Sequence, residues 1–335
     1  MLSKKIGIDL GTCTVQVFVQ GEGIVFNQPS VVATNSDRSR ILAVGQEAYD
    51  MMGRTPENVH AVRPMREGVI ADFVVTEGML HYFIRRVHGR QRLFKPDLMV
   101  AVPSGVTGVE RRAMVEAALQ AGARQAWLIE EPLAAAIGAN LPVGTPSGSA
   151  VCDIGGGTTE MAIISLDGIV TSSSVRVGGI KMDEAIAAYV RKRHNLLIGE
   201  RTAEEVKIQI GSALPLNDNP IVSVRGRDMV AGLPKNEKIS ADEVMEAIQD
   251  QLAAILGCVR TALEQTPPEL AADIYDKGLV LTGGGAMLRN LDRFLSISTG
   301  IPTIVADEPQ TCVVKGTGLA LEHSEVFKRG PLRLN

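Results

Sequence analysis

Residues 150–160 read Ala-Val-Cys-Asp-Ile-Gly-Gly-Gly-Thr-Thr-Glu, an apolar strand that runs into an aspartate, three glycines and two threonines. Glycines let the backbone turn sharply and expose successive N–H groups to a bound anion. The threonine hydroxyls can donate to the same anion, and Asp153 can hold a hard cation directly or through water. The pattern therefore favours a site for phosphate and Mg²⁺, although a glycine hairpin with a structural aspartate has the same sequence.

A shorter version of this pattern lies near the start of the chain. Residues 6–14 read Ile-Gly-Ile-Asp-Leu-Gly-Thr-Cys-Thr, so Asp9 also leads a strand into a glycine–threonine turn. Asp9 and Asp153 are separated by a little less than half of the chain, a spacing typical of a duplicated unit and not of a short-period array. Two such hairpins, facing each other across a cleft, could hold one polyphosphate between them.

Two further stretches belong to the same pattern. Residues 279–285, Leu-Val-Leu-Thr-Gly-Gly-Gly, end a third strand in glycines that can lie flat against a base or sugar. Residues 130–138, Glu-Glu-Pro-Leu-Ala-Ala-Ala-Ile-Gly, predict a helix with proline in its first turn and a small face that another helix can approach. One interpretation is that the negative charges of Glu130 and Glu131 are simply favoured by the dipole at the start of the helix. The other is that one of the two residues orients a water for attack on a phosphate.

Serine or threonine followed three residues later by glutamate predicts helix starts elsewhere in the chain. Such pairs occur at Thr107–Glu110 and at Ser240–Glu243. The helix that begins at Ser240 is expected to reach about Glu264, with Gly257 as a candidate kink.

A third such pair, Thr202–Glu205, predicts the start of a helix that carries Glu204 and Lys207. These two residues are three apart, so they share one helix face. They are either an exposed ion pair or, if the helix borders a cleft, ligands for a ribose and a purine.

The composition narrows the classes of protein to which the chain can belong. Its 335 residues are 45% hydrophobic but only 4% aromatic, which fits one large or two smaller well-packed domains. The net charge of −4 disfavours nucleic acid as the main partner. The cysteines are scattered without a C-x-x-C pair, which disfavours a disulfide framework or a zinc site. Without a signal sequence or a long apolar run, we expect a cytoplasmic protein that could still lie on a membrane.

Residues 85–96 read Arg-Arg-Val-His-Gly-Arg-Gln-Arg-Leu-Phe-Lys-Pro and place basic residues around an apolar pair, Leu93 and Phe94. One interpretation is a solvated turn whose apolar pair packs into the core. The other is a loop that touches a membrane, in which the apolar pair enters the interface and each basic residue gains roughly 1 kcal/mol from anionic headgroups. The residues alone leave both interpretations open.

Together, the three strand–glycine turns and the Glu-Glu-Pro helix resemble the superfamily of actin, sugar kinases and heat-shock-chaperone ATPases. The corresponding turns of that superfamily are its phosphate 1, phosphate 2 and adenosine motifs. Within the superfamily, the chain resembles the MreB family of bacterial actins over essentially its whole length. The stretches that carry this resemblance are 6–11, 23–33, 63–72, 109–112, 128–138, 198–204, 265–270 and 281–285.

The resemblance implies an α/β fold of the actin type, in which a ribonuclease-H-like unit is duplicated. Two domains, each of two subdomains, would then surround a nucleotide cleft that holds ATP or ADP with Mg²⁺. The implied subdomains are IA (1–32, with 75–144 and 315–335), IB (33–74), IIA (145–181, with 240–314) and IIB (182–239).

The resemblance also implies roles for single residues. Asp9 and Asp153 would hold Mg²⁺ and its waters, and Glu131, more than Glu130, would orient the attacking water. Glu204 and Lys207 would contact the ribose and adenine. The residues that would approach the phosphates or close over the nucleoside are Gly11, Thr12, Cys13, Thr14, Gly155, Gly156, Gly157, Thr158, Gly283, Gly284 and Gly285.

The function implied by the resemblance is that of an ATPase that polymerises into paired protofilaments on the inner face of the cytoplasmic membrane. Such filaments organise cell-wall synthesis and maintain rod shape, and slow ATP hydrolysis is coupled to their dynamics. Leu93 and Phe94 match the membrane-inserting loop of the family. The implied partners are the chain itself, the membrane and the elongation proteins MreC, MreD and RodZ, with no nucleic acid.

The chain departs from the family pattern at two places, and we expect no N-terminal amphipathic helix of the kind that some members carry, because Lys4 is already at the first strand. Cys13-Thr14 stands where Ala-Asn is usual, and Ile180 stands where an acidic residue is typical. Both departures bear on nucleotide affinity and turnover and not on the identity of the site. A chaperone ATPase is disfavoured because the chain ends soon after Gly318, and a small-molecule kinase because no catalytic aspartate has the required context.

Overall fold

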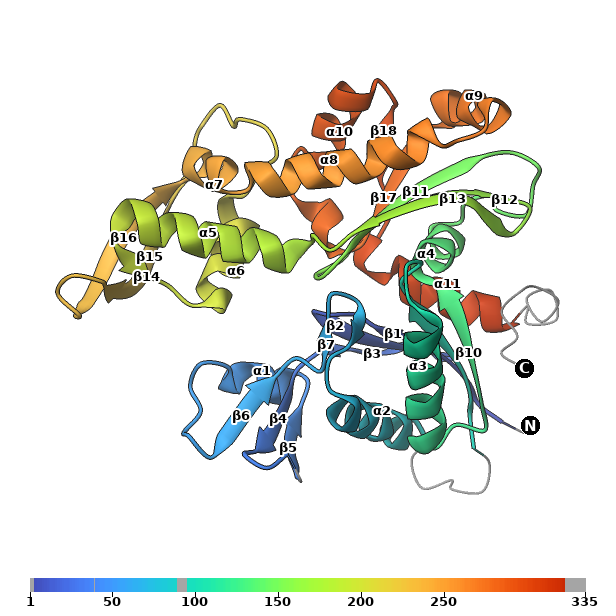
Figure 1. Cartoon of the computed structure of the whole chain (residues 1–335), viewed down its shortest axis with the longest axis horizontal. Coiled ribbons are helices and arrows are strands. Elements are labelled where there is room, and N and C mark those ends of the chain that lie inside the picture. The colour runs from blue at the N-terminus through green and yellow to red at the C-terminus, as the bar shows by residue number, and fades with distance from the viewer. Residues whose placement is uncertain (1–2, 39, 89–94, 323–335) are drawn as a thin grey trace.

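Two five-stranded sheets form the centre of the molecule in the computed structural model, which describes residues 3–38, 40–88 and 95–322 (Figure 1). The strands of the first sheet are β1 (Lys5–Leu10), β2 (Thr14–Val19), β3 (Gly23–Pro29), β9 (Asp97–Val102) and β10 (Gln125–Glu130). Those of the second sheet are β11 (Ser149–Ile154), β12 (Thr159–Ser165), β13 (Gly168–Val175), β17 (Leu279–Thr282) and β18 (Thr303–Val305). We call the halves built on these sheets the first and second domains.

The two sheets have the same topology. Their strand orders are β3-β2-β1-β9-β10 and β13-β12-β11-β17-β18. When the five strands of each sheet are counted along the chain, the third is at one edge of the sheet and the fifth is at the other. The first three strands are antiparallel, and the last two run parallel to the first. The register also repeats, because Asp9 pairs with Gln16 and Asp153 pairs with Glu160. The predicted duplicated fold of the actin type is confirmed.

Two helices, α4 (Glu131–Gly138) and α11 (Cys312–Glu322), cross between the sheets (Figure 1). Their backbones touch, since a Cβ on Gly138 would lie 1.8 Å from the carbonyl oxygen of Cys312 and one on Gly316 1.8 Å from that of Ala134. The close approach predicted from the small residues of α4 is therefore present.

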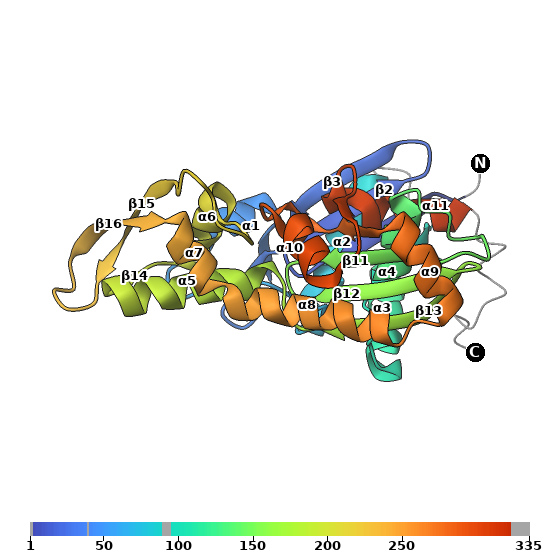
Figure 2. The same cartoon turned by 90° about the horizontal axis from the view of Figure 1, so that it is seen from above.

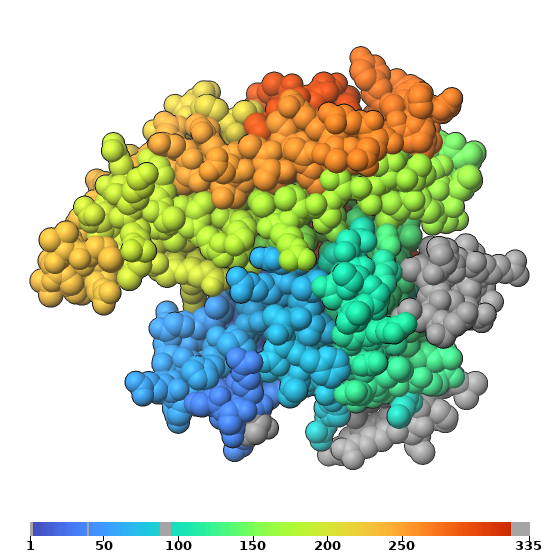
Figure 3. Space-filling view, viewed as in Figure 1, coloured from blue at the N-terminus to red at the C-terminus, as the bar shows by residue number. Residues whose placement is uncertain are grey.

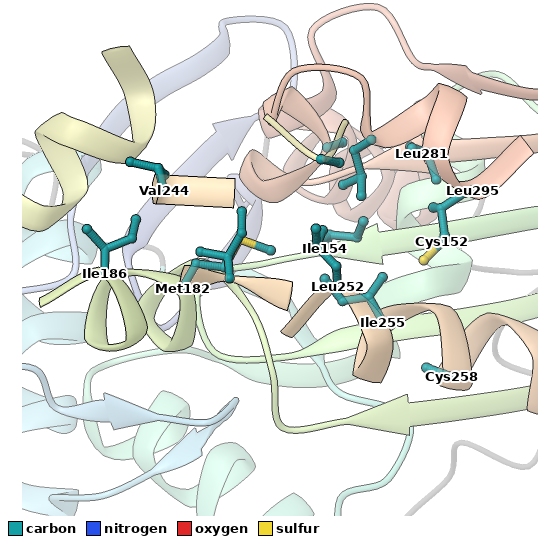
Figure 4. Close-up of a cluster of buried hydrophobic side chains, with 14 of the residues drawn as sticks. Cys152, Ile154, Met182, Ile186, Val244, Leu252, Ile255, Cys258, Leu281 and Leu295 are labelled. Atoms are coloured by element: carbon teal, nitrogen blue, oxygen red, sulfur yellow. The ribbon is translucent and has the colours of Figure 1, made fainter. Parts of the chain in front are cut away.

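The outer faces of the sheets are covered by further helices. These are α2 (Phe73–His88) and α3 (Gly108–Gln120) in the first domain, and α8 (Gln249–Glu264), α9 (Pro268–Lys277) and α10 (Leu291–Thr299) in the second. Helix α8 runs along β12 and β13 (Figure 2). Its residues Leu252 and Ile255 share one buried core with Cys152 and Ile154 of the sheet (Figure 4). Each domain thus has its own apolar core.

A smaller three-stranded sheet extends each domain, at the left in Figure 1. In the first domain it contains β4 (Val32–Asn35), β5 (Ile41–Val44) and β6 (Val59–Val62), with α1 (Gln46–Met51). In the second it contains β14 (Leu196–Leu197), β15 (Ile221–Asp228) and β16 (Pro234–Ser240), with α5 (Gly179–His194), α6 (Glu200–Ile210) and α7 (Ala241–Ala247). The remaining elements are β7 (Met65–Arg66), β8 (Val69–Ile70) and two 3-10 turns, Gly284–Met287 and Pro309–Thr311. Figure 3 shows the first domain, blue to teal, below the second.

The helix starts at Thr107 and Ser240 are confirmed as capping boxes, but two other predictions are wrong. Helix α6 begins at Glu200, because the carbonyl of Gly199 already accepts from the N–H of Ala203; Thr202 is therefore inside the first turn. The helix after Ser240 breaks at Ile248 and not at Gly257. The break lets α7 pack on α5 while α8 follows the second sheet.

Candidate functional site

A cavity of about 370 Å³ lies between the two domains. Its walls come from the turns after β1, β11 and β17, the start of α4 and one face of α6. All predicted cleft residues line it: Asp9, Gly11, Thr12, Cys13, Thr14, Glu131, Asp153, Gly155, Gly156, Gly157, Thr158, Glu204, Lys207, Gly283, Gly284 and Gly285. Segments far apart in the chain therefore converge on one cavity.

The two phosphate-type turns, one from each domain, are in direct contact. A Cβ on Gly156 would lie 2.2 Å from Sγ of Cys13, and one on Gly157 would lie 2.5 Å from Oγ1 of Thr12. No side chain fits at these two glycines. The turns therefore present mainly backbone to the cavity, and backbone N–H groups in such turns bind anions well.

Three buried carboxylates line the cavity, Asp9, Asp153 and Glu131, and a fourth, Glu160, pairs with Asp153 on the neighbouring strand. Burial raises the pKa of each. The pKa of Asp9 rises to about 7, from burial and then from repulsion by Asp153. That of Asp153 rises to about 6, although Oγ1 of Thr282 donates to its Oδ1 at 2.8 Å. The pKa of Glu160 rises to about 8, and that of Glu131 lies well above its usual value, through burial and then the charge of Glu160. This concentration of buried negative charge favours a bound cation.

The carboxylates fit Mg²⁺ held jointly with phosphates. Within the described ranges, no three His, Cys, Asp or Glu side chains converge as a ready metal cage. Mg²⁺ does not need one, because it usually keeps several waters and is bound through one or two carboxylates plus substrate phosphates. Asp9 and Asp153, which end equivalent strands and line the cavity, supply such a pair.

Glu130 and Glu131 have different surroundings. Glu131 is 9% exposed and lines the cavity at the first turn of α4. Glu130 instead forms an ion pair with Arg111, with Nη2 and Oε1 2.7 Å apart. Of the two, only Glu131 can reach a ligand in the cavity.

The other end of the cavity is bordered by α6. Nζ of Lys207 lies 2.8 Å from Oδ1 of Asp183 and donates to the carbonyl of Gly179 at 3.0 Å. The buried carboxyl of Asp183 has its pKa raised to about 6 by desolvation, despite the lysine beside it. Glu204 accepts a hydrogen bond from the hydroxyl of Tyr49 at 2.8 Å. Both predicted nucleoside residues therefore face the cavity with defined partners.

Several lining residues were not identified from the sequence. Gln16 is 1% exposed, lies in the cavity wall, and its Oε1 has no hydrogen-bond partner among the residues that the structure covers. A lone polar residue within an apolar strand was the signal that could have found it. Arg289 and Gln310 also line the cavity, the second from the 3-10 turn at 309–311, and neither lies in a recognisable sequence pattern.

Ile180 and the apolar pair Leu93 and Phe94 were also singled out by their sequence context. Ile180, the departure from an acidic residue, lies in the first turn of α5, and its N–H donates to the carbonyl of Gly156 at 2.9 Å. Leu93 and Phe94 lie outside the described residues. In the described part of the chain, no helix is long and apolar enough to span a membrane.

Comparison with known proteins identifies the family. The family described as MreB/Mbl protein matches residues 3–329. The chain is 54% identical to the cell shape-determining protein MreB of Escherichia coli (strain K12) over 327 residues, which are 96% of this chain and 94% of that protein. The chain belongs to the MreB/Mbl family. It is also 47% identical to the cell shape-determining protein Mbl of Bacillus subtilis (strain 168), over 99% of this chain and 100% of that protein.

Two solved structures have the same fold as this chain. MreB5 of Spiroplasma citri bound to ADP matches with a TM-score of 0.92 and 38% identity, over 98% of this chain and 99% of that chain. The MamK double helical filament matches with a TM-score of 0.81 at 22% identity, over 96% of this chain and 99% of that chain, and so supports the fold alone. Membership of the family supports a cytoskeletal role in cell shape.

Proposed function

We propose that this chain is an ATP-dependent, actin-like cytoskeletal protein. It polymerises into membrane-associated filaments that organise cell-wall synthesis and maintain rod shape, and slow ATP hydrolysis drives filament dynamics. The observation that carries the proposal is the contact of two equivalent turns, Cys13 on Gly156 and Thr12 on Gly157, over buried carboxylates at the junction of the domains. The related MreB5 of Spiroplasma citri has been crystallised with ADP and with AMPPNP, which supports a nucleotide ligand.

In this proposal, each part of the cavity has one role. The turns at 11–14 and 155–158 bind the β- and γ-phosphates from opposite sides through N–H and hydroxyl donors. Asp9 and Asp153 hold Mg²⁺, which when bound supplies positive charge that stabilises the phosphates. Glu204 and Lys207 contact the ribose and adenine, and residues 283–285 cover the nucleoside.

Glu131 acts in hydrolysis by accepting a hydrogen bond from one water and orienting it toward the γ-phosphate. Its place in the first turn of α4, away from bulk solvent, restricts the positions open to that water. Positioning of this kind contributes much of the catalysis in phosphoryl transfer. Because both domains contact the phosphates, loss of the γ-phosphate changes how the domains close and so weakens filament contacts.

The remaining parts of the proposal concern domains, location and partners. The subdomain boundaries are those expected from the sequence, with IB at 33–74 and IIB at 182–239 beside the cleft. The filament lies on the inner face of the cytoplasmic membrane, into which Leu93 and Phe94 insert. Each subunit binds the membrane weakly, and the many subunits of one filament together bind it strongly. Its partners are further copies of the chain, paired as protofilaments, and the elongation proteins MreC, MreD and RodZ.

Co-sedimentation with lipid tests the assembly directly. The chain is incubated with ATP, ADP or no nucleotide, with vesicles of anionic or neutral lipid, then centrifuged and viewed by electron microscopy. We expect filaments with ATP and Mg²⁺, and their enrichment on anionic vesicles. If no nucleotide or lipid produces filaments, the cytoskeletal proposal is wrong.

A further inference from the structure

A group of contacts joins α6 to the first domain across the mouth of the cavity. The hydroxyl of Tyr49 in α1 donates to Oε2 of Glu204 at 2.8 Å, although the two residues are 155 positions apart in the chain. One turn before Glu204, Oε1 of Glu200 lies 2.8 Å from Nη2 of Arg63. Arg201 lies over the ring of Tyr49, 5.5 Å from its centroid. The helix that carries the predicted nucleoside residues is therefore tied to the opposite domain.

The hydrogen bond from Tyr49 is the most specific of these contacts. The ion pair of Arg63 with Glu200 has one partner 40% exposed, and exposed ion pairs contribute little. The Tyr49–Glu204 bond is partly buried. Burial and then the hydrogen bond to the Glu204 carboxylate raise the pKa of Tyr49 well above its usual value, so the hydroxyl keeps its proton and remains a donor at physiological pH.

The bond fixes one oxygen of a carboxylate that faces the cavity. Glu204 lines the cavity together with Lys207, whose own ammonium is held by Asp183. With Oε2 taken by Tyr49, the other oxygen of Glu204 is left for a ligand hydroxyl. A carboxylate that is already held in one orientation loses less entropy when it binds a ligand.

We propose that Tyr49 is a positioning residue for the nucleoside: its hydroxyl holds Glu204 so that the free oxygen accepts from a ribose hydroxyl. This inference rests on the proposed function, because it needs a nucleotide in the cavity. It adds that recognition of the sugar depends on a residue of the opposite domain. Ribose binding and closure of the cleft are then coupled through one hydrogen bond.

Nucleotide titrations of the full chain with Mg²⁺ test the inference. Tyr49→Phe should weaken ATP binding by about three- to tenfold, the range for one lost hydrogen bond. It should leave the affinity for 2′,3′-dideoxy-ATP, which lacks both ribose hydroxyls, within twofold of the wild type. In a Glu204→Ala background, Tyr49→Phe should have no further effect.

A matched control comes from Tyr189, whose hydroxyl donates to Oε2 of Glu246 at 2.8 Å and which does not line the cavity. Tyr189→Phe should leave both affinities unchanged. The inference is overturned if Tyr49→Phe binds ATP as tightly as the wild type, or more tightly. It is also overturned if the variant loses the same factor for ATP and the dideoxy analogue. Failure of the wild type to bind ATP would instead reject the proposed function itself, and this inference with it.

Discussion

Gln16 and Glu160 occupy equivalent positions in the two domains. Each lies on the second strand of its sheet and pairs directly with the aspartate of the first, Gln16 with Asp9 and Glu160 with Asp153. Both are 1% exposed. The duplicated unit therefore places a buried polar side chain beside each candidate metal ligand, neutral in one domain and acidic in the other.

Replacement of Gln16 by leucine should stabilise the empty protein and weaken its ligand binding. Leucine keeps the apolar volume and removes a buried acceptor that has no partner among the described residues, worth about 1 kcal/mol or more of stability. If Oε1 of Gln16 accepts from a ligand or from its bound water, the affinity for ATP with Mg²⁺ falls. Thermal unfolding without ligand and calorimetric titration measure the two effects. Unchanged stability would contradict the first part of this prediction, and unchanged affinity would contradict the second.

The acidic counterpart, Glu160, should make stability fall as the pH rises. Burial and then the charge of Asp153 raise its pKa in the folded chain from an ordinary value of 4.5 to about 8, although the N–H of Ser104 donates to it at 3.0 Å. The folded state thus holds this proton more tightly than the unfolded state, and the stabilisation present at low pH is lost between about pH 4.5 and 8.

Glu160→Gln is the variant that isolates this effect. Glutamine can still accept from Ser104 but does not titrate. Melting temperatures measured from pH 5 to 8.5 in EDTA, without nucleotide, should decline less steeply for the variant than for the wild type. Parallel curves would show that Glu160 is not the group responsible.

Gly156→Ala should separate the two phosphate turns and reduce nucleotide affinity at least tenfold. The new methyl group would meet Sγ of Cys13 at 2.2 Å and its Cβ at 2.8 Å. Cys13→Ala in the same chain should restore part of the affinity. Gly257→Ala is the control, since nothing lies within 4 Å of its added Cβ in α8. It should stabilise the helix by roughly 0.5–1 kcal/mol and leave binding intact. Wild-type affinity in Gly156→Ala would mean that the turns do not need to touch.

Glu131→Gln should bind ATP and form filaments but release phosphate about 10²-fold more slowly or worse, the usual loss for a positioned acid or base. Phosphate release in assembled samples gives the rate, and pelleting gives assembly. Glu130→Gln is the matched control, because that residue pairs with Arg111 instead. If the wild type and Glu131→Gln release phosphate at the same rate, Glu131 does not orient the attacking water.

Exchange of Leu93 and Phe94 for serine should abolish binding to anionic vesicles without preventing assembly. The expectation follows from the apolar pair between basic residues in the sequence. Flotation of filaments with vesicles measures it, with pelleting in the absence of lipid as the control for assembly. Continued flotation of the double variant would show that another part of the chain contacts the lipid.

The sequence predicted the cavity well because its chemistry is encoded locally. Aspartate at a strand end followed by glycine and threonine predicts a turn with exposed N–H groups, which favours a bound anion. Resemblance to a family then supplied the arrangement of these turns. By contrast, the choice between Glu130 and Glu131 could not be made locally, since it depends on Arg111, which lies on another helix.

The errors arose where tertiary packing outweighed a local signal. The Thr202–Glu205 pattern is that of a capping box, but the chain already turns into α6 at Gly199. Gly257 is the weakest helix former near the middle of its segment. The break nevertheless occurs at Ile248, because α7 packs on α5 while α8 packs on β12 and β13. Gln16 is marked in the sequence only as a lone polar residue in an apolar strand, and its register with Asp9 shows that the two residues are cross-strand partners.

The backbone contacts between α4 and α11 restrict how the domains can move. Sliding of packed helices needs side chains that can shift between neighbouring rotamers. At Gly138 and Gly316 the contact is with main-chain carbonyls, which have no rotamers to change. We therefore expect the crossing to resist translation, so that any relative movement of the sheets is a rotation about it. Such a rotation would be amplified with distance and would displace the outlying three-stranded sheets most.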